Sequence, residues 1–76
     1  MDIQQFIANV ADQFDELDVE LTPATEFRKL ETWTSLVALL IITMIDDEYN
    51  IVLAPEEMRQ TNTIQELYDL VANKQA

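Results

Sequence analysis

Ser35 is the residue whose chemistry matters most in this chain, because it precedes a run from Leu36 to Ile45 in which every residue but Thr43 is apolar. A serine acts as a nucleophile only when a neighbouring base activates it, and the chain has no histidine and only Lys29 nearby as an amine. A hydrolytic role for Ser35 is therefore disfavoured. As an acceptor of a phosphoryl group it needs no base of its own, and the start of a helix favours an anion. The alternative is that Thr34 or Ser35 simply caps the helix.

Residues that could bind a metal or act as general bases are few. The chain has no histidine and no cysteine, so the commonest general base and the common nitrogen and sulfur metal ligands are missing. The acidic cluster Asp46, Asp47 and Glu48 lacks the alternating oxygen ligands and the glycine turn of a calcium loop, so we interpret it as a solvated helix end. We expect no metal site and no enzymatic activity.

The charge of the chain restricts its partners. Fifteen acidic and four basic residues give a net charge of −11 and an acidic pI. Such a surface repels phosphate backbones and attracts basic proteins, so we expect no nucleic-acid binding. The apolar run is shorter than the roughly 20 residues that span a bilayer, so we expect no membrane insertion. No signal peptide is evident at the start, and we expect a cytoplasmic protein.

Three segments of the 76-residue chain show helical spacing of apolar residues. They predict helices over about residues 2–17, residues 35–49, and from Ile64 to about residue 73. Thr63 and Glu66 form a capping box before the last of these helices.

Two further segments connect these helices. Pro55 opens a short helical turn over residues 56–60. Residues 18–33 have no sustained period and predict a long first loop, with Phe27 and Leu30 packed on the core. We therefore predict an all-α fold in a single domain, residues 1–76, as a small four-helix bundle of three main helices and one short one.

The helix over residues 35–49 is apolar on two sides, and its orientation has to be inferred. Ala38, Leu39, Ile42, Ile45 and Tyr49 fall on one side, and the opposite stripe continues into Asp47 and Glu48, which must be solvated. We therefore assign the first set to the core. The outer set is Leu36, Val37, Leu40, Ile41 and Met44.

The residues around Ser35 and after it resemble those of the acyl carrier protein family. Thr34-Ser35-Leu36 is similar to the family's Asp-Ser-Leu signature at the start of the second helix. The resemblance continues through three further blocks: Asp46 to Ile51, Pro55-Glu56-Glu57 and Thr61 to Gln65. The matched part covers over half of the chain, and the N-terminal helix fits by its pattern alone.

The resemblance implies a 4′-phosphopantetheine arm on Ser35, installed from coenzyme A by a phosphopantetheinyl transferase with magnesium. The thiol of the arm would carry acyl groups as thioesters between enzymes of fatty acid biosynthesis or of a polyketide-type pathway, which would make the chain a phosphoprotein of lipid metabolism. Two alternatives are an amino-acyl or peptidyl carrier and a small helical interaction module without an arm. The acidic pI favours an acyl carrier over a peptidyl one.

Two departures from the family pattern concern the partners. Thr34 stands where the family usually has aspartate, and Val37 and Leu40 are aliphatic where carriers of fatty acid synthesis have acids. An exposed apolar patch usually marks an interface. We therefore predict that acyl-loading and acyl-processing enzymes, or a second copy of the chain, dock on the outer set of residues, with acidic residues meeting basic groups. The alternative is that the loop carrying Phe27, Leu30 and Trp33 covers part of this stripe. The predicted docking residues are Leu36, Val37, Leu40, Ile41, Met44, Asp47, Glu48 and Glu56.

Overall fold

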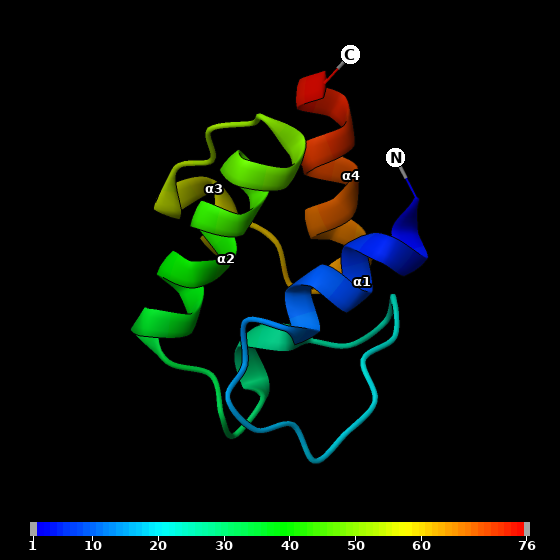
Figure 1. The fold of residues 1–76 in the computed structure, drawn as a ribbon, viewed down its shortest axis with the longest axis vertical. Coiled ribbons are helices and arrows are strands. Elements are labelled where there is room, and N and C mark those ends of the chain that lie inside the picture. The colour runs from blue at the N-terminus through cyan, green and yellow to red at the C-terminus, as the bar shows by residue number, and fades with distance from the viewer. Residues whose placement is uncertain (1, 76) are drawn as a thin grey trace.

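The computed structural model describes residues 2–75, and this part of the chain is an all-α bundle (Figure 1). Its helices are α1 (Ile3–Ala11), α2 (Ser35–Tyr49), α3 (Pro55–Arg59) and α4 (Ile64–Gln75), with a short 3-10 turn, η1, at Phe27–Lys29. Helix α1 contacts both α2 and α4, and α3 packs against α2. The predicted helix over residues 35–49 is confirmed at both ends.

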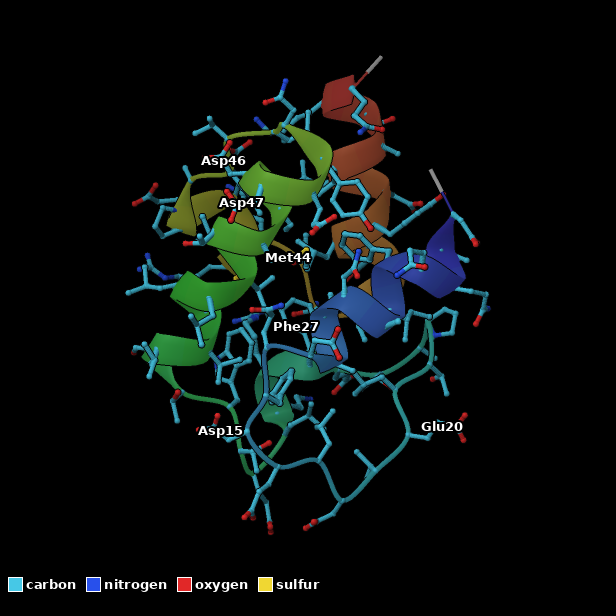
Figure 2. The ribbon with its side chains drawn as sticks, in the orientation of Figure 1. Asp15, Glu20, Phe27, Met44, Asp46 and Asp47 are labelled. Carbon is cyan, nitrogen blue, oxygen red and sulfur yellow. The ribbon has the colours of Figure 1, made fainter. Side chains whose placement is uncertain are left out.

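The buried apolar side chains form one cluster to which every helix contributes. Phe6 and Val10 of α1 meet Ile41 and Ile45 of α2 and Leu67 of α4. In Figure 2, Phe27 and Met44 lie inside the bundle, whereas Asp15 and Glu20 lie at its periphery. The full set of buried apolar residues is Phe6, Val10, Phe14, Leu21, Phe27, Val37, Ile41, Met44, Ile45, Leu53, Met58, Ile64, Leu67 and Val71.

Helix α1 is shorter than predicted, ending at Ala11 instead of about residue 17. Asp2 caps its start, with its carboxylate accepting a hydrogen bond from the Gln4 amide at 3.0 Å. Beyond Ala11 the sequence places Asp12, Asp15 and Glu16 at the negative end of the helix dipole, where carboxylates destabilise a helix. The apolar spacing nevertheless continues past the helix end, because Phe14 is buried from the following turn.

The long first loop is held by hydrogen bonds to the start of α4. The amide of Ile64 donates to the Thr25 carbonyl at 3.1 Å, and the amide of Gln65 donates to the Pro23 carbonyl at 2.9 Å. Phe27 is fully buried and Leu30 is half-buried, which confirms that this segment packs on the core. The middle of the loop is therefore attached both to α4 and to the core.

Helix α4 begins with the predicted capping box. The Glu66 amide donates to Thr63 Oγ1 at 3.2 Å, and the Thr63 amide donates to Glu66 Oε1 at 3.1 Å. Hydrogen bonds from the amides of Asn62 and Thr63 lower the pKa of the Glu66 carboxyl. The α3 turn begins at Pro55, as predicted, and ends at Arg59.

The orientation predicted for α2 is wrong in part. Val37, Ile41 and Met44 of the predicted outer set are buried, whereas Leu39 of the predicted core set is 57 % exposed. Ile45 is buried and Leu36 and Leu40 are exposed, as predicted. Glu48 continues the line of Val37, Ile41 and Met44 but is exposed, because the last turn of the helix reaches the edge of the core. The exposure of Glu48 therefore does not show whether the earlier residues of the same stripe face solvent or the core.

Candidate functional site

Thr34 caps the helix that Ser35 begins. Thr34 has an extended backbone (φ −140°, ψ 167°), its Oγ1 accepts a hydrogen bond from the Val37 amide at 3.2 Å, and its carbonyl accepts one from Ala38 at 3.1 Å. This is the geometry of a threonine N-cap. The choice between Thr34 and Ser35 as the capping residue is thus decided in favour of Thr34.

Ser35 is left exposed, and its hydroxyl has no hydrogen-bond partner within residues 2–75. In the same part of the chain, the amides of Ser35 and Leu36 also have no acceptor, since Thr34 accepts only the amides of Val37 and Ala38. A phosphate ester on the Ser35 oxygen would lie beside these two amides at the positive end of α2. The residues at this helix start therefore fit a phosphate-linked group.

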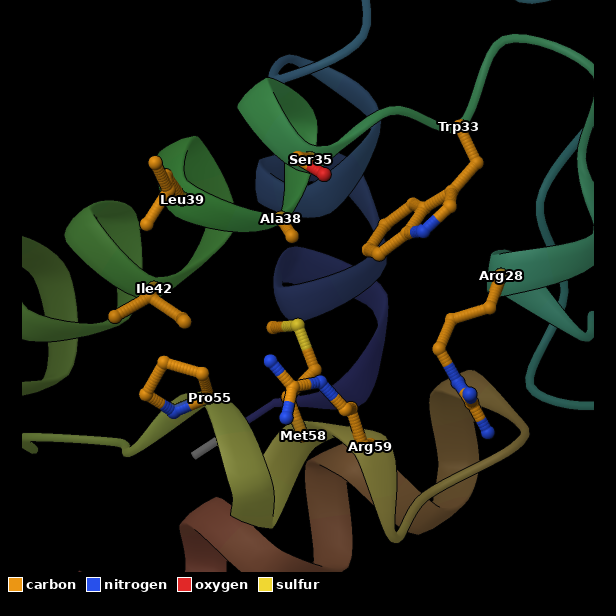
Figure 3. A pocket seen from close by; sticks show the side chains of 9 residues that line it. All are labelled: Arg28, Trp33, Ser35, Ala38, Leu39, Ile42, Pro55, Met58 and Arg59. Atoms are coloured by element: carbon orange, nitrogen blue, oxygen red, sulfur yellow. The ribbon is translucent and has the colours of Figure 1, made fainter.

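A pocket of about 400 Å³ opens next to Ser35, between the first loop, α2 and α3 (Figure 3). Its size is that of a small-molecule site. Most of its wall is apolar, and two arginines complete it. The lining residues are Arg28, Trp33, Ser35, Ala38, Leu39, Ile42, Pro55, Met58 and Arg59.

Aromatic contacts hold the loop side of this pocket. The ring of Trp33 packs edge-on against Phe27 at 5.4 Å between centroids and lies 6.2 Å from the ring of Phe14. Arg28 is also fixed, because its Nε donates to the Thr61 carbonyl at 3.1 Å and a terminal nitrogen donates to Asn62 Oδ1 at 2.8 Å. Sequence reasoning placed Trp33 in the loop but did not identify it as part of the site.

Two side chains of α2 that line the pocket, Ala38 and Ile42, are half-buried, and Leu39 is exposed. All three belong to the stripe that the sequence analysis assigned to the core. No sequence signal separated a pocket wall from a core wall here, because both are built from aliphatic residues and α2 is apolar on every side in its first turns.

The predicted docking residues separate into two groups. Leu36 is 62 % exposed and Leu40 is 38 % exposed, and Asp47, Glu48 and Glu56 are also exposed. The other group, Val37, Ile41 and Met44, is buried in the core and is not available to a partner in this structure. These three side chains are buried because α2 turns them toward the bundle. Cover by the first loop, the alternative given in the sequence analysis, is not needed to explain their burial.

An exposed serine without a hydrogen bond, at the start of the second helix of a small all-α bundle and next to an apolar pocket, is the arrangement that a covalently attached group requires. A family model of the phosphopantetheine attachment site matches residues 4–71, and the chain belongs to this family. Comparison with curated proteins and with solved structures gives no match.

The protein is thus a phosphopantetheine-binding carrier protein with an acyl-carrier-like fold, and its cofactor is covalent 4′-phosphopantetheine. None of the helices within residues 2–75 has the length and apolar character needed to cross a membrane.

Proposed function

We propose that Ser35 carries the 4′-phosphopantetheine arm and that the protein delivers acyl groups, as thioesters, between enzymes of fatty-acid or polyketide-type biosynthesis. The observation that carries this proposal concerns the Ser35 hydroxyl. It belongs to an exposed residue and makes no hydrogen bond within residues 2–75, whereas its neighbour Thr34 caps the helix. Ser35 is also the only serine in the chain, and it lies within the matched residues 4–71.

Attachment of the arm is a phosphoryl transfer in which Ser35 supplies the nucleophile. Its oxygen forms a bond to the β-phosphorus of coenzyme A, the pyrophosphate P–O bond breaks, and adenosine 3′,5′-bisphosphate leaves. The serine proton passes to a base of the transferase, because this chain has no histidine to take it. The amides of Ser35 and Leu36 then stabilise the negative phosphodiester at the helix start.

The arm supplies a thiol, which forms the thioester with the acyl group. The chain itself has no thiol, because it contains no cysteine. The chain itself orients the arm, offers a pocket beside it and presents surfaces to other enzymes. We propose that it catalyses no reaction of its own and acts in the cytoplasm.

The proposed docking surface lies on the exposed face of α2. Leu36, Leu40 and Asp47 follow one another at helical spacing and therefore share this face. Glu48 and Glu56 are exposed nearby in the sequence and add negative charge. A transferase or an acyl-processing enzyme with an apolar patch next to basic side chains would complement this surface.

The attachment is tested by the intact mass after incubation with coenzyme A, magnesium and a broad-specificity phosphopantetheinyl transferase. We expect the wild type to gain one phosphopantetheine and Ser35→Ala to gain none. Thr34→Ala is the matched control, because it removes the adjacent hydroxyl and should keep the gain. A wild type that several transferases leave unmodified, or a gain that persists in Ser35→Ala, would contradict the proposal.

A further inference from the structure

Arg59 is the one basic side chain without a partner among the residues that the structure describes. The other three bases of the chain are engaged. Lys29 pairs with Glu26 at 2.7 Å, Lys74 pairs with Glu57 at 2.8 Å, and Arg28 donates to Thr61 and Asn62. In a chain with fifteen acidic residues, a guanidinium without an internal anion is available for an external one.

The side chain of Arg59 lies over the pocket next to Ser35. In the view of Figure 3 its guanidinium overlaps the side chain of Met58 below the sulfur and points toward Pro55, whereas the guanidinium of Arg28 turns away from the other lining side chains. Ser35 and Trp33 stand on the opposite side of the same pocket from Arg59. A group attached to Ser35 that entered this pocket would therefore meet apolar walls first and a positive charge beyond them.

We infer that Arg59 selects acyl groups that end in a carboxylate, and that these groups lie in the pocket between α2 and α3 with the carboxylate on the guanidinium. This inference rests on the proposed function, because the arm on Ser35 is what would deliver the acyl group. A guanidinium binds a carboxylate through two parallel hydrogen bonds, and the aliphatic part of the acyl group would contact Ala38 and Ile42.

The same charge discriminates against other cargo. An uncharged fatty acyl group gains the apolar contacts alone. An aminoacyl group brings an ammonium, which Arg59 would repel. Arg59 is exposed, so water and salt screen its interactions, and the preference is expected to be about two- to fivefold in the ratio of docked to free cargo.

The experiment loads the protein with three five-carbon groups through their coenzyme A thioesters and a phosphopantetheinyl transferase: glutaryl, valeryl and 5-aminovaleryl. They differ only at the end of the chain, which is anionic, uncharged or cationic. Loading is first verified by intact mass. The docked fraction is then followed by the fluorescence of Trp33, which is the only tryptophan of the chain and lines the pocket. The NMR signal of the Arg59 Nε–H group gives a second measurement.

In the wild type we expect docking in the order glutaryl, valeryl, 5-aminovaleryl, with a shift of the Arg59 signal for glutaryl alone. Arg59→Gln should remove the difference between glutaryl and valeryl, and Arg59→Lys should restore part of it. Lys29→Gln is the control, because it removes a positive charge that does not line this pocket and should keep the wild-type order.

Equal docking of glutaryl and valeryl in the wild type, or a preference that survives in Arg59→Gln, overturns the role of Arg59 and leaves the carrier function intact. Absence of any mass gain overturns both proposals. The two failures are therefore distinguished before any fluorescence is recorded. Arg59 is exposed and without internal partners, so its variants are expected to keep the wild-type melting temperature.

Discussion

Two adjacent hydroxyl groups, those of Thr34 and Ser35, have different tasks in this protein. The Thr34 hydroxyl accepts the Val37 amide and fixes where α2 begins. The Ser35 hydroxyl makes no hydrogen bond within residues 2–75 and faces solvent. Thr34 thus supplies the capping oxygen at the position where the resemblance leads one to expect an aspartate, which is also a good N-cap residue.

At this scale we predict that Thr34→Ala destabilises the protein by about 1 kcal/mol through loss of the cap. Chemical denaturation followed by circular dichroism measures the change in the free energy of unfolding. Thr43→Ala is the control, because it removes a hydroxyl from an exposed position inside the same helix, and alanine has the better helix propensity there. Equal losses in the two variants would mean that the Thr34 hydroxyl does not cap α2.

Ser35 could be proposed from the sequence because Thr34-Ser35-Leu36 and the downstream blocks resemble the acyl carrier protein family. Which of the two hydroxyls forms the cap could not be decided, since serine and threonine both serve. Trp33 and Arg59 could not be assigned to the site, because the loop and the α3 turn that carry them are adjacent only in the folded structure.

Helix α2 has three different environments, because separate sides of it face the core, the pocket and solvent. Val37 and Ile41 belong to the core, Ala38 and Ile42 line the pocket, and Leu40 is partly exposed. The helix and its ends were predictable from the length of the apolar run and from its flanking polar residues. Its rotation was not, because a helix that is apolar on all sides in its first turns has no polar face to mark the solvent.

The rotation of α2 predicts opposite outcomes for two substitutions that introduce the same charge. Val37→Asp places a carboxylate in the core and should cost roughly 3 kcal/mol or more, which is enough to unfold a domain of this size in part or fully. Leu40→Asp changes an exposed position and should leave the melting temperature within a few degrees of the wild type.

Leu40→Asp also tests the docking surface. If Leu40 contacts partners, this folded variant should be processed more slowly by acyl-loading enzymes and by the transferase, which initial rates at limiting enzyme would reveal. Val52→Asp is the control, because it introduces the same charge at an exposed aliphatic position outside α2. A folded Leu40→Asp variant with unchanged rates would remove Leu40 from the docking surface.

At the scale of the whole molecule, negative charge surrounds a small apolar core. The fifteen acids are spread along the chain, and the two described ion pairs involve only Glu26 and Glu57. The pair with Lys74 and the hydrogen bond from the Ala54 amide lower the pKa of Glu57, but this local gain does not offset a net charge of −11. Mutual repulsion of the acids should therefore limit stability.

We accordingly predict that the melting temperature rises with ionic strength, because salt shortens the range of this repulsion from about 30 Å at 0.01 M to about 3 Å at 1 M. Thermal unfolding between 0.02 and 1 M NaCl, followed by circular dichroism, measures the effect, and potassium chloride serves as a check on ion identity. A melting temperature that falls or stays constant over this range would show that repulsion among the acids does not limit stability.

The cap at Thr34 also has a consequence for the order of events in the life of the protein. The cap uses no atom of the Ser35 side chain, so we expect the unmodified chain to reach its final fold first and to receive the proposed arm afterwards. The transferase would then meet a preformed surface instead of a flexible segment. Folding and modification depend on neighbouring residues but on separate atoms, and either can be altered by substitution while the other is kept.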